Sequence, residues 1–405
     1  ILAEEDWVPV DPKLEGPRID KCPKCGSAEF IGERDVFDTW MDSSITCAVH
    51  AGWPDRADWK RLFPADMHPS GIDIIRTWAY YLMVRHLALF NEKPYKSCLI
   101  NGMVLGADGR KMSKSLKNYV AAPEVLNKNG ADATRQWAAG GGATGSDIPY
   151  RAPDVEYGRR FIVKLWNVSS FVSKLLQSYV PTATGKVELQ PLDKWILSKA
   201  ETLTKKVTDA MEKCQFNIAM EEIRNFTWHI FCDAYVEAVK DRLYRPEVHG
   251  ETKKLAAQQT LYEVLFKILQ LLAPFVPHVT EEIYQTMYFG SKGYKSIQVS
   301  PWPEYQEALV DENAEKRGNL VVELISEVRR EKAEKRLSLN TPIKQLTVYA
   351  GDPSAAEAIE EAKADVVGAL KISQLTVMPE SGNGRPLTQF STVNFIAEYG
   401  ELTKR

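Results

Sequence analysis

The chain has 405 residues, a formal net charge of −3, 44% hydrophobic residues and 26% charged residues. These values are ordinary for a soluble globular protein, and the length predicts two or three domains. The charge excludes a general basic coat, so a nucleic acid would have to be bound by local patches. No apolar run approaches the roughly 20 residues of a membrane span, and the N-terminus has no signal-peptide pattern.

The first 150 residues mix short apolar runs with Gly, Pro and Trp. We expect a strand opening into a loop at 35–46, a helix at 71–90 and a buried strand at 97–105. This order is typical of part of a βαβ arrangement. The Gly-rich stretch 121–150 is expected to be irregular.

Long helical patterns begin at about residue 155. Apolar stripes predict helices within 161–175, 196–211, 216–244 and 253–272, and prolines separate a further helix at 273–287. Helices of this kind with polar loops form a bundle. After a linker at 301–305, the sequence predicts a small α+β module: an amphipathic helix at 319–340, a strand-like run, a helix at 354–370 and a second strand-like run.

The six cysteines are scattered apart from Cys22 and Cys25 in "KCPKC". Two cysteines at this spacing supply half of a structural zinc site, which needs four ligands. The next candidates, Cys47 and His50, fall inside another element, so we expect a half-site, with a partly liganded metal as the alternative. The lack of a disulfide framework predicts a reducing, cytoplasmic compartment.

The segment "GADGRKMSKSLKN" (106–118) concentrates positive charge after an apolar run. A basic run is most often a solvated face. Here a turn signal and alternating serines favour a mobile loop that folds over a polyphosphate and neutralises developing charge. The sequence has no G-x-x-x-x-G-K-[ST], which excludes a P-loop.

"KMSKS" (111–115) matches the signature loop of the class I aminoacyl-tRNA synthetases. Further segments, in the order of that family, resemble its valyl-tRNA synthetases: "DTWMDSSI" (38–45), "SGIDIIRTW" (70–78), "GSDIPY" (145–150), "KLWNVSSFV" (164–172), "FCDAYVE" (231–237) and "LLAPFVPHVTEEIY" (271–284). The resemblance covers roughly residues 20–345. The sequence departs from the family at Lys117, where a Gly is usual, and at Ala234, where a Trp is usual.

The resemblance implies a ligase that activates valine with ATP and Mg²⁺ and transfers it to tRNA(Val). The residues expected to handle the ATP phosphates are Lys111, Ser113, Lys114 and Ser115, with Lys114 the most important. Gly71 and Asp73 are expected at the adenosine ribose, although Asp73 also fits a helix cap.

The resemblance also implies an amino-acid pocket and an RNA-binding surface. Trp40, Ile74 and Trp78 are expected to form the pocket walls, although such residues are by pattern alone more typical of a core. The helical bundle is expected to bind the anticodon. A phosphate-binding strip is expected on the basic half of the helix at 319–340, with a solvated basic face as the alternative; its residues are Arg329, Arg330, Lys332, Lys335 and Arg336. The expected tRNA contacts are Arg159, Lys164, Asn167, Arg224, Trp228, Lys240, Arg329 and Arg330.

The expected fold is thus a partial Rossmann-type α/β catalytic half, an all-α helical bundle and a small α+β C-terminal module. We expect a zinc-knuckle remnant and linker at 1–34, the catalytic half at 35–153, the bundle at 154–305 and the C-terminal module at 306–405. The second class I signature, H-x-G-H, does not occur in the sequence. We therefore expect a monomeric C-terminal fragment that lacks the editing domain and is inactive alone. The alternatives are an isoleucyl-type fragment and a free-standing tRNA-binding module.

Overall fold

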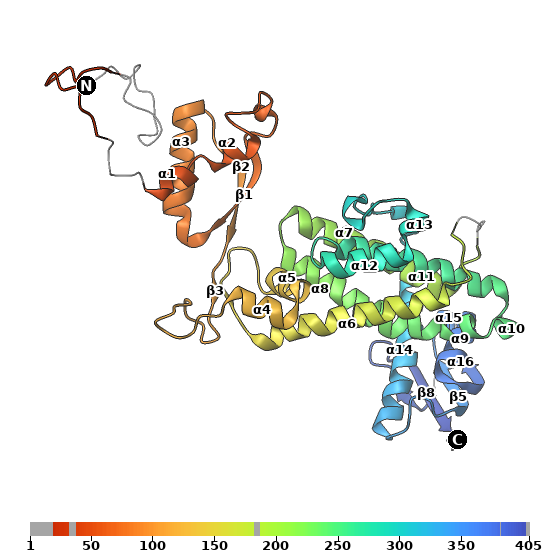
Figure 1. The fold of residues 1–405 in the computed structure, drawn as a ribbon. Coiled ribbons are helices and arrows are strands. Elements are labelled where there is room, and N and C mark those ends of the chain that lie inside the picture. The colour runs from red at the N-terminus through yellow and green to blue at the C-terminus, as the bar shows by residue number, and fades with distance from the viewer. Residues whose placement is uncertain (1–18, 32–37, 182–186, 381, 402–405) are drawn as a thin grey trace. The chain divides into compact units, whose positions relative to one another are not determined.

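The computed structural model describes residues 19–31, 38–181, 187–380 and 382–401 (Figure 1). The chain divides into two compact units, Ile1–Asn101 and Gly102–Arg405. Most of the expected linker at 1–34 and the first residues of the segment 35–46 lie outside the described residues. Within the described parts, no helix combines the length and the apolar character that a membrane span requires.

The first unit is built on two parallel strands. β1 (Ala65–Gly71) pairs with β2 (Tyr95–Asn101) from Ala65 opposite Tyr95 to Gly71 opposite Asn101. α3 (Tyr80–Phe90) connects them in a βαβ unit, which confirms the expected helix and second strand, although β1 itself was not predicted. Its core includes Ala48, Phe63, Leu82 and Tyr95.

The segment before β1 is helical, so the expected strand at 35–46 is wrong for the described residues. α1 (Thr39–Ser43), α2 (Thr46–Ala51) and the 3₁₀-helix η2 (Trp59–Arg61) occupy this region. The Asp38 carboxylate accepts a hydrogen bond of 2.8 Å from the backbone N–H of Trp40 and thereby starts α1. A local cap of this kind outweighs the strand propensity of the neighbouring residues.

The expected helix at 71–90 is present in three segments. A 3₁₀-helix η3 (Ile72–Ile74) and a π-helix η4 (Ile75–Ala79) precede α3. The N-cap residues of η3, η4 and α3 are Gly71, Ile74 and Ala79, so Asp73 lies inside η3 and is not the N-cap residue of any of these segments. π-Helical turns are uncommon and concentrate at functional sites.

The second unit begins with a short parallel pair, β3 (Val104–Leu105) and β4 (Ile148–Pro149). Between these strands lie α4 (Ala122–Asn129) and α5 (Ala131–Gly140), so the irregular structure expected at 121–150 is wrong for most of this stretch. Gly130, at φ +84°, separates the two helices. Val125 and Ala133 bury their side chains with Val155 in a small core.

The bundle confirms the helices expected from the apolar stripes. Its long helices are α6 (Ala152–Leu175), α7 (Pro191–Glu212) and α11 (Glu251–Leu272). The segment 216–244 is α8 (Phe216–Asn225), a π-helix η5 (Phe226–Val236) and α9 (Glu237–Tyr244). The shorter elements are α10 (Pro246–His249), α12 (Pro277–Met287), α13 (Phe289–Lys292), η6 (Ile297–Val299) and η7 (Glu307–Leu309).

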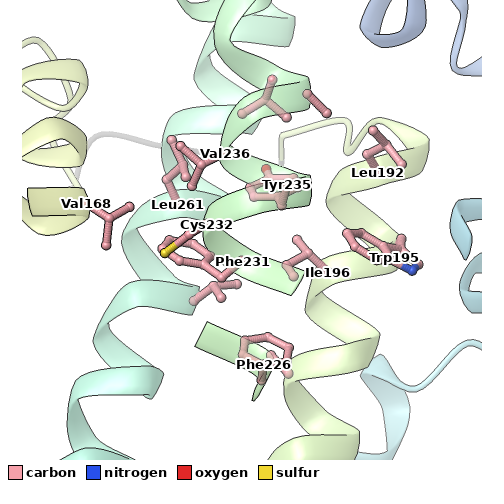
Figure 2. Close-up of a cluster of buried hydrophobic side chains, with 14 of the residues drawn as sticks. Val168, Leu192, Trp195, Ile196, Phe226, Phe231, Cys232, Tyr235, Val236 and Leu261 are labelled. Atoms are coloured by element: carbon pink, nitrogen blue, oxygen red, sulfur yellow. The ribbon is translucent and has the colours of Figure 1, made fainter. Parts of the chain in front are cut away.

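The bundle core surrounds η5. Figure 2 shows Phe231, Cys232 and Tyr235 of this π-helix between Ile196 on one side and Leu261 on the other. These five side chains are at most 5% exposed. Burial of such aliphatic and aromatic groups is worth roughly 1.5–3 kcal/mol each, and it holds the π-helix in place.

The C-terminal module contains α14 (Glu312–Glu334), α15 (Pro353–Glu361), α16 (Lys363–Leu370) and a four-stranded sheet. The strand order is β6 (Ile372–Met378), β5 (Ile343–Ala350), β8 (Val393–Tyr399) and β7 (Arg385–Pro386). β5 is parallel to β6 and antiparallel to β8. The sequence predicted β5 and β6, whereas β7 and β8 were not predicted. With these elements, the expected fold class is confirmed.

A buried ionic group connects the bundle to the C-terminal module. The Arg242 guanidinium of α9 donates to the Asp193 carboxylate of α7 at 2.8 and 3.0 Å and lies 2.7 Å from the Asp365 carboxylate of α16. The Tyr235 hydroxyl donates to Asp193 at 2.7 Å. All four residues are at most 2% exposed, so every charge here depends on its partners.

Candidate functional site

The loop 106–118 leaves β3 and folds back on itself. The backbone N–H of Gly106 donates to the carbonyl of Arg110 at 2.8 Å, and Leu105 forms an antiparallel bridge with Lys111. Gly109, at φ +74°, makes the turn. Gly106 is buried, and a Cβ there would lie 2.8 Å from an Asp108 oxygen, which explains why this position needs glycine.

Asn118 holds the two ends of the loop together. Its amide donates to the Asp108 carboxylate at 3.1 Å and to the carbonyl of Lys111 at 3.2 Å, and its carbonyl accepts from the backbone N–H of Ser113 at 2.8 Å. Hydrogen bonds from the Arg110 backbone, the Asn118 amide and the Arg110 guanidinium lower the pKa of Asp108 to about 2. The carboxylate therefore stays charged throughout the neutral range. This role of Asn118 was not predicted, although its position directly after the basic run was a signal.

Lys117 occupies the position where the family usually has glycine. Its backbone is left-handed, with φ +53°, which is the conformation that glycine adopts most easily. The departure from the family pattern is therefore accommodated without a change of backbone region.

The functional groups of the loop point to solvent. Lys111, Lys114 and Ser115 are exposed, and the Ser113 and Ser115 hydroxyl oxygens are 2.7 Å apart. Lys114 has no carboxylate within ion-pair distance among the described residues. An exposed ammonium on a folded loop is available to an incoming phosphate.

The Asn118 contacts predict the behaviour of the loop towards a protease. Asn118→Ala removes three hydrogen bonds worth about 1 kcal/mol each at most in this exposed setting. We expect trypsin at pH 8 to cleave within residues 110–117 about tenfold faster or more, since local opening exposes the cleavage sites. Asn129→Ala, which removes one amide hydrogen bond to Val125 in α4, is the control. Equal cleavage of the two variants would contradict the role of Asn118.

Gly71 and Asp73 lie at the carboxyl end of β1 in the first unit. A Cβ on Gly71 would lie 2.8 Å from the Asp73 Oδ1 atom, so glycine allows the carboxylate to approach the end of the strand. The carboxyl ends of parallel strands are where α/β folds bind ligands. The geometry is therefore compatible with a ribose contact.

The three residues expected to form the amino-acid pocket do not line one cavity. Trp40 lines a cavity of about 610 Å³ together with Tyr81 and Arg85. Trp78 lines a different cavity of about 340 Å³, packs 4.7 Å from the His68 ring and donates its indole N–H to the carbonyl of Ser43. Ile74 is half-buried in η3 and lines neither cavity.

Cys22 and Cys25 form a turn of the kind found in zinc knuckles. The backbone N–H of Gly26 donates to the carbonyl of Cys22 at 2.8 Å, and Gly26 has φ +75°. Hydrogen bonds from the Cys25 and Lys24 backbones lower the pKa of the Cys22 thiol. The described residues contain no group of three or more potential metal ligands, so the pair does not by itself fit a structural zinc ion.

Several of the expected tRNA contacts are engaged within the bundle. Arg159 pairs with Glu156 at 2.9 Å, Lys164 with Asp233 at 2.8 Å, and Lys240 with Glu237. Asn167 is exposed on α6.

Arg224 and Trp228 gather near one tyrosine. The Arg224 guanidinium lies 4.8 Å from the centre of the Tyr157 ring, and the Trp228 ring stacks on Tyr157 at 6.2 Å. Lys164 lies over the Trp228 ring at 5.6 Å. Cationic and aromatic groups are thus concentrated at the junction of α6, α8 and η5.

The basic half of α14 is not a strip of free cations. Arg330 pairs with Glu327 at 2.9 Å, Lys335 pairs with Glu331, and Arg329 is 4.0 Å from Glu237. The buried Lys332 ammonium donates to the carbonyls of Leu339, Thr341 and Leu370 at 3.3, 2.7 and 3.2 Å. Burial and the nearby Arg329 and Lys371 charges lower its pKa to about 8. The expected phosphate contact at Lys332 is therefore wrong.

Ala234, where the family usually has tryptophan, lines a cavity of about 440 Å³ with Trp195, Asn319 and Val322. The small side chain thus leaves space between η5, α7 and α14.

Two family models match the chain. The model for class I tRNA synthetases (I, L, M and V) matches residues 11–151, and the anticodon-binding domain of tRNA ligase matches residues 193–348. A valine–tRNA ligase of Methanothermobacter thermautotrophicus is 46% identical over 93% of this chain and 41% of its own length. One of Pyrococcus horikoshii is 40% identical over 100% of this chain and 46% of its own length. The chain thus spans less than half the length of these relatives.

A solved structure agrees on the fold. The agnB2 LeuRS of Agrobacterium radiobacter K84, in a ternary complex with tRNA and LeuAMS, matches 72% of this chain and 35% of its own chain. The TM-score is 0.57 and the sequence identity is 23%, so this likeness concerns the fold alone. The synthetase loop, the matched synthetase and anticodon-binding domains and the identity to valine–tRNA ligases together show that the chain belongs to the valyl-tRNA synthetase family of class I aminoacyl-tRNA ligases.

Proposed function

We propose that this chain supplies the ATP-handling loop, part of the valine pocket and the tRNA-binding bundle of a valine–tRNA ligase. In this reaction the valine carboxylate attacks the α-phosphate of ATP, and pyrophosphate leaves. The acyl group then passes to the terminal ribose of tRNA(Val). The similarity to valine–tRNA ligases supports this substrate over isoleucine.

The loop 106–118 carries the proposal for the first step. Lys111 and Lys114 neutralise the negative charge that develops on the departing pyrophosphate, and the Ser113 and Ser115 hydroxyls donate hydrogen bonds to it. The observation that supports this role is the exposure of Lys114 on a loop whose ends Asn118 holds together. Mg²⁺ would be held mainly by the ATP phosphates, which it binds through oxygen atoms.

The first unit contributes substrate recognition in this proposal. Asp73 accepts hydrogen bonds from the adenosine ribose. Trp40, Ile74 and Trp78 line no common cavity in this structure, so in this proposal they come together around the amino-acid side chain only when it binds. Bulky walls of this kind disfavour one extra methylene by about 1–3 kcal/mol. We further propose a monomeric protein of the cytoplasm, in keeping with six cysteines that are all free.

A chimera tests the function. The 377 matched residues replace the corresponding segment of the Methanothermobacter relative, and valine-dependent ATP–pyrophosphate exchange is measured. We expect exchange with valine and much weaker exchange with isoleucine. A folded chimera that binds tRNA(Val) without any exchange would overturn the catalytic part and favour a tRNA-binding module.

A further inference from the structure

Three arginines around Tyr157 differ from most arginines of the second unit. Six examples each have a carboxylate within 4 Å: Arg159, Arg242, Arg245, Arg317, Arg330 and Arg385. Arg151, Arg160 and Arg224 have no such partner among the described residues. An arginine without a carboxylate partner keeps its full charge available for an external anion.

Two of these arginines line one cavity, and the third, Arg160, lies near a ring that lines it. Arg151, Tyr157 and Arg224 line a cavity of about 320 Å³ where α5, α6 and α8 meet. The Arg224 and Arg160 guanidinium groups lie 4.8 and 5.9 Å from the centre of the Tyr157 ring. Contact with an aromatic face positions a guanidinium but leaves its N–H donors free to bind a phosphate.

The cavity also presents hydrogen-bond acceptors. Asp154, in the first turn of α6, and Gln136, on α5, line it. Gln136 is only 2% exposed, and its Oε1 atom has no hydrogen-bond partner in the described part of the chain. This atom packs against Gly158 of α6, where a Cβ would lie 2.8 Å from it, so the exposed Asp154 carboxylate is the acceptor that a ligand in the cavity can reach. A lone anion would not use this carboxylate, whereas a ribose hydroxyl donates to it.

We propose that this cavity binds one ribose-phosphate unit of an RNA backbone. The guanidinium groups of Arg151 and Arg224 bind the phosphate, Arg160 adds positive charge next to the Tyr157 ring, and Asp154 accepts from the 2′-hydroxyl. The inference rests on the proposed function, in which the RNA is tRNA(Val), and it adds a contact site outside the loop 106–118. Because the contacts are to the backbone, the cavity contributes affinity and the distinction of RNA from DNA, and it does not read base sequence.

Salt dependence tests the phosphate contact. Binding of a tRNA(Val) transcript to the full chain is measured between 50 and 200 mM salt for the wild type and for a variant with Arg151→Gln, Arg160→Gln and Arg224→Gln. If at least two phosphate contacts are lost, the slope of log K against log salt falls by about 1.4–1.8. Over a fourfold salt range this corresponds to about a tenfold smaller loss of affinity than the wild type shows. Arg245→Gln, which removes an exposed arginine that is already paired with Asp241 and is not among the expected tRNA contacts, should leave the slope nearly unchanged.

The outcomes separate this site from the proposed function. If the wild type binds tRNA(Val) and the triple variant shows the same salt slope, phosphate binding at this cavity is wrong, while the proposed function stays intact. Failure of the wild-type chain to bind tRNA(Val) would overturn both. Thermal melting by circular dichroism checks that the variants fold, and the pair of exposed residues, Arg151→Gln with Arg160→Gln, is measured alone if Arg224→Gln unfolds the bundle.

Asp154→Asn tests the ribose contact, because the two possible roles of the carboxylate predict opposite changes in tRNA affinity. Asp154→Asn removes a negative charge from the cavity, so tRNA binding should become tighter if the carboxylate only faces the phosphate. If Asp154 accepts from the 2′-hydroxyl, the charge-assisted hydrogen bond is weakened and binding should fall about fivefold. Tighter binding would overturn the ribose part of the proposal.

Discussion

Arg242→Met is expected to lower the free energy of unfolding of the second unit by about 3–5 kcal/mol. The substitution removes the cation that neutralises Asp193 and Asp365, and both carboxylates then remain buried without a counter-charge. Asp193 also accepts from the backbone N–H of Gln190 at the start of α7, so a shift of Asp193 would also weaken the capping box of this helix. Urea unfolding followed by circular dichroism measures the change.

A neighbouring arginine provides the control for this experiment. Arg245, one turn further along the chain, pairs with Asp241 but its side chain is 50% exposed. Arg245→Met should cost less than about 1 kcal/mol, because exposed ion pairs contribute little. Similar losses in the two variants would show that the buried group does not connect bundle and module as described.

Lys114→Ala in the chimera is expected to lower valine-dependent ATP–pyrophosphate exchange about 10²–10³-fold. Removal of one group that stabilises developing charge typically has an effect of this size on turnover. The Michaelis constant for valine should change little, because the lysine does not contact the amino acid in the proposed mechanism.

Lys117→Gly is the matched control for Lys114→Ala. It removes a lysine from the same loop and keeps the left-handed backbone at this position, where φ is +53°. Exchange should stay within about threefold of the parent chimera. If both variants lose activity equally, the loop acts through its general positive charge and the specific role of Lys114 is wrong.

The helical bundle was the part of the fold that the sequence predicted best. Stripes such as Phe161, Leu165 and Val172 repeat at the helical period, and their burial against other helices of the bundle fixes the structure. The strand β2 and the helix α3 before it also follow from local pattern, whereas β1 was not predicted. A long helix contains many apolar residues at the helical period, so one residue that breaks the pattern does not change the prediction.

The regions that were not predicted depend on single polar contacts. The cap at Asp38 turns residues 39–43 into a helix, and Gly130 separates two helices in a stretch that composition marks as irregular. At the candidate site, the motif located Lys111 and Lys114 but could not show that Asn118 bonds to three parts of the loop. Such contacts depend on the backbone path, which residue spacing does not reveal.

The sequence also did not show which charged side chains are free to bind a ligand. The sequence marked Arg330 and Lys332 as phosphate ligands because they lie in a basic run. In the structure Arg330 pairs with glutamates, and Lys332 lies inside the C-terminal module. Composition counts charges, whereas the availability of each charge is decided by its neighbours in space.

The enclosed position of Lys332 has a chemical consequence. Acylating reagents attack only an amine that is deprotonated and open to solvent, and this nitrogen is covered on all sides by the module. Modification at Lys332 therefore requires α14 to part from the segments that carry Leu339, Thr341 and Leu370. The rate at which Lys332 is acylated therefore reports how often the C-terminal module opens.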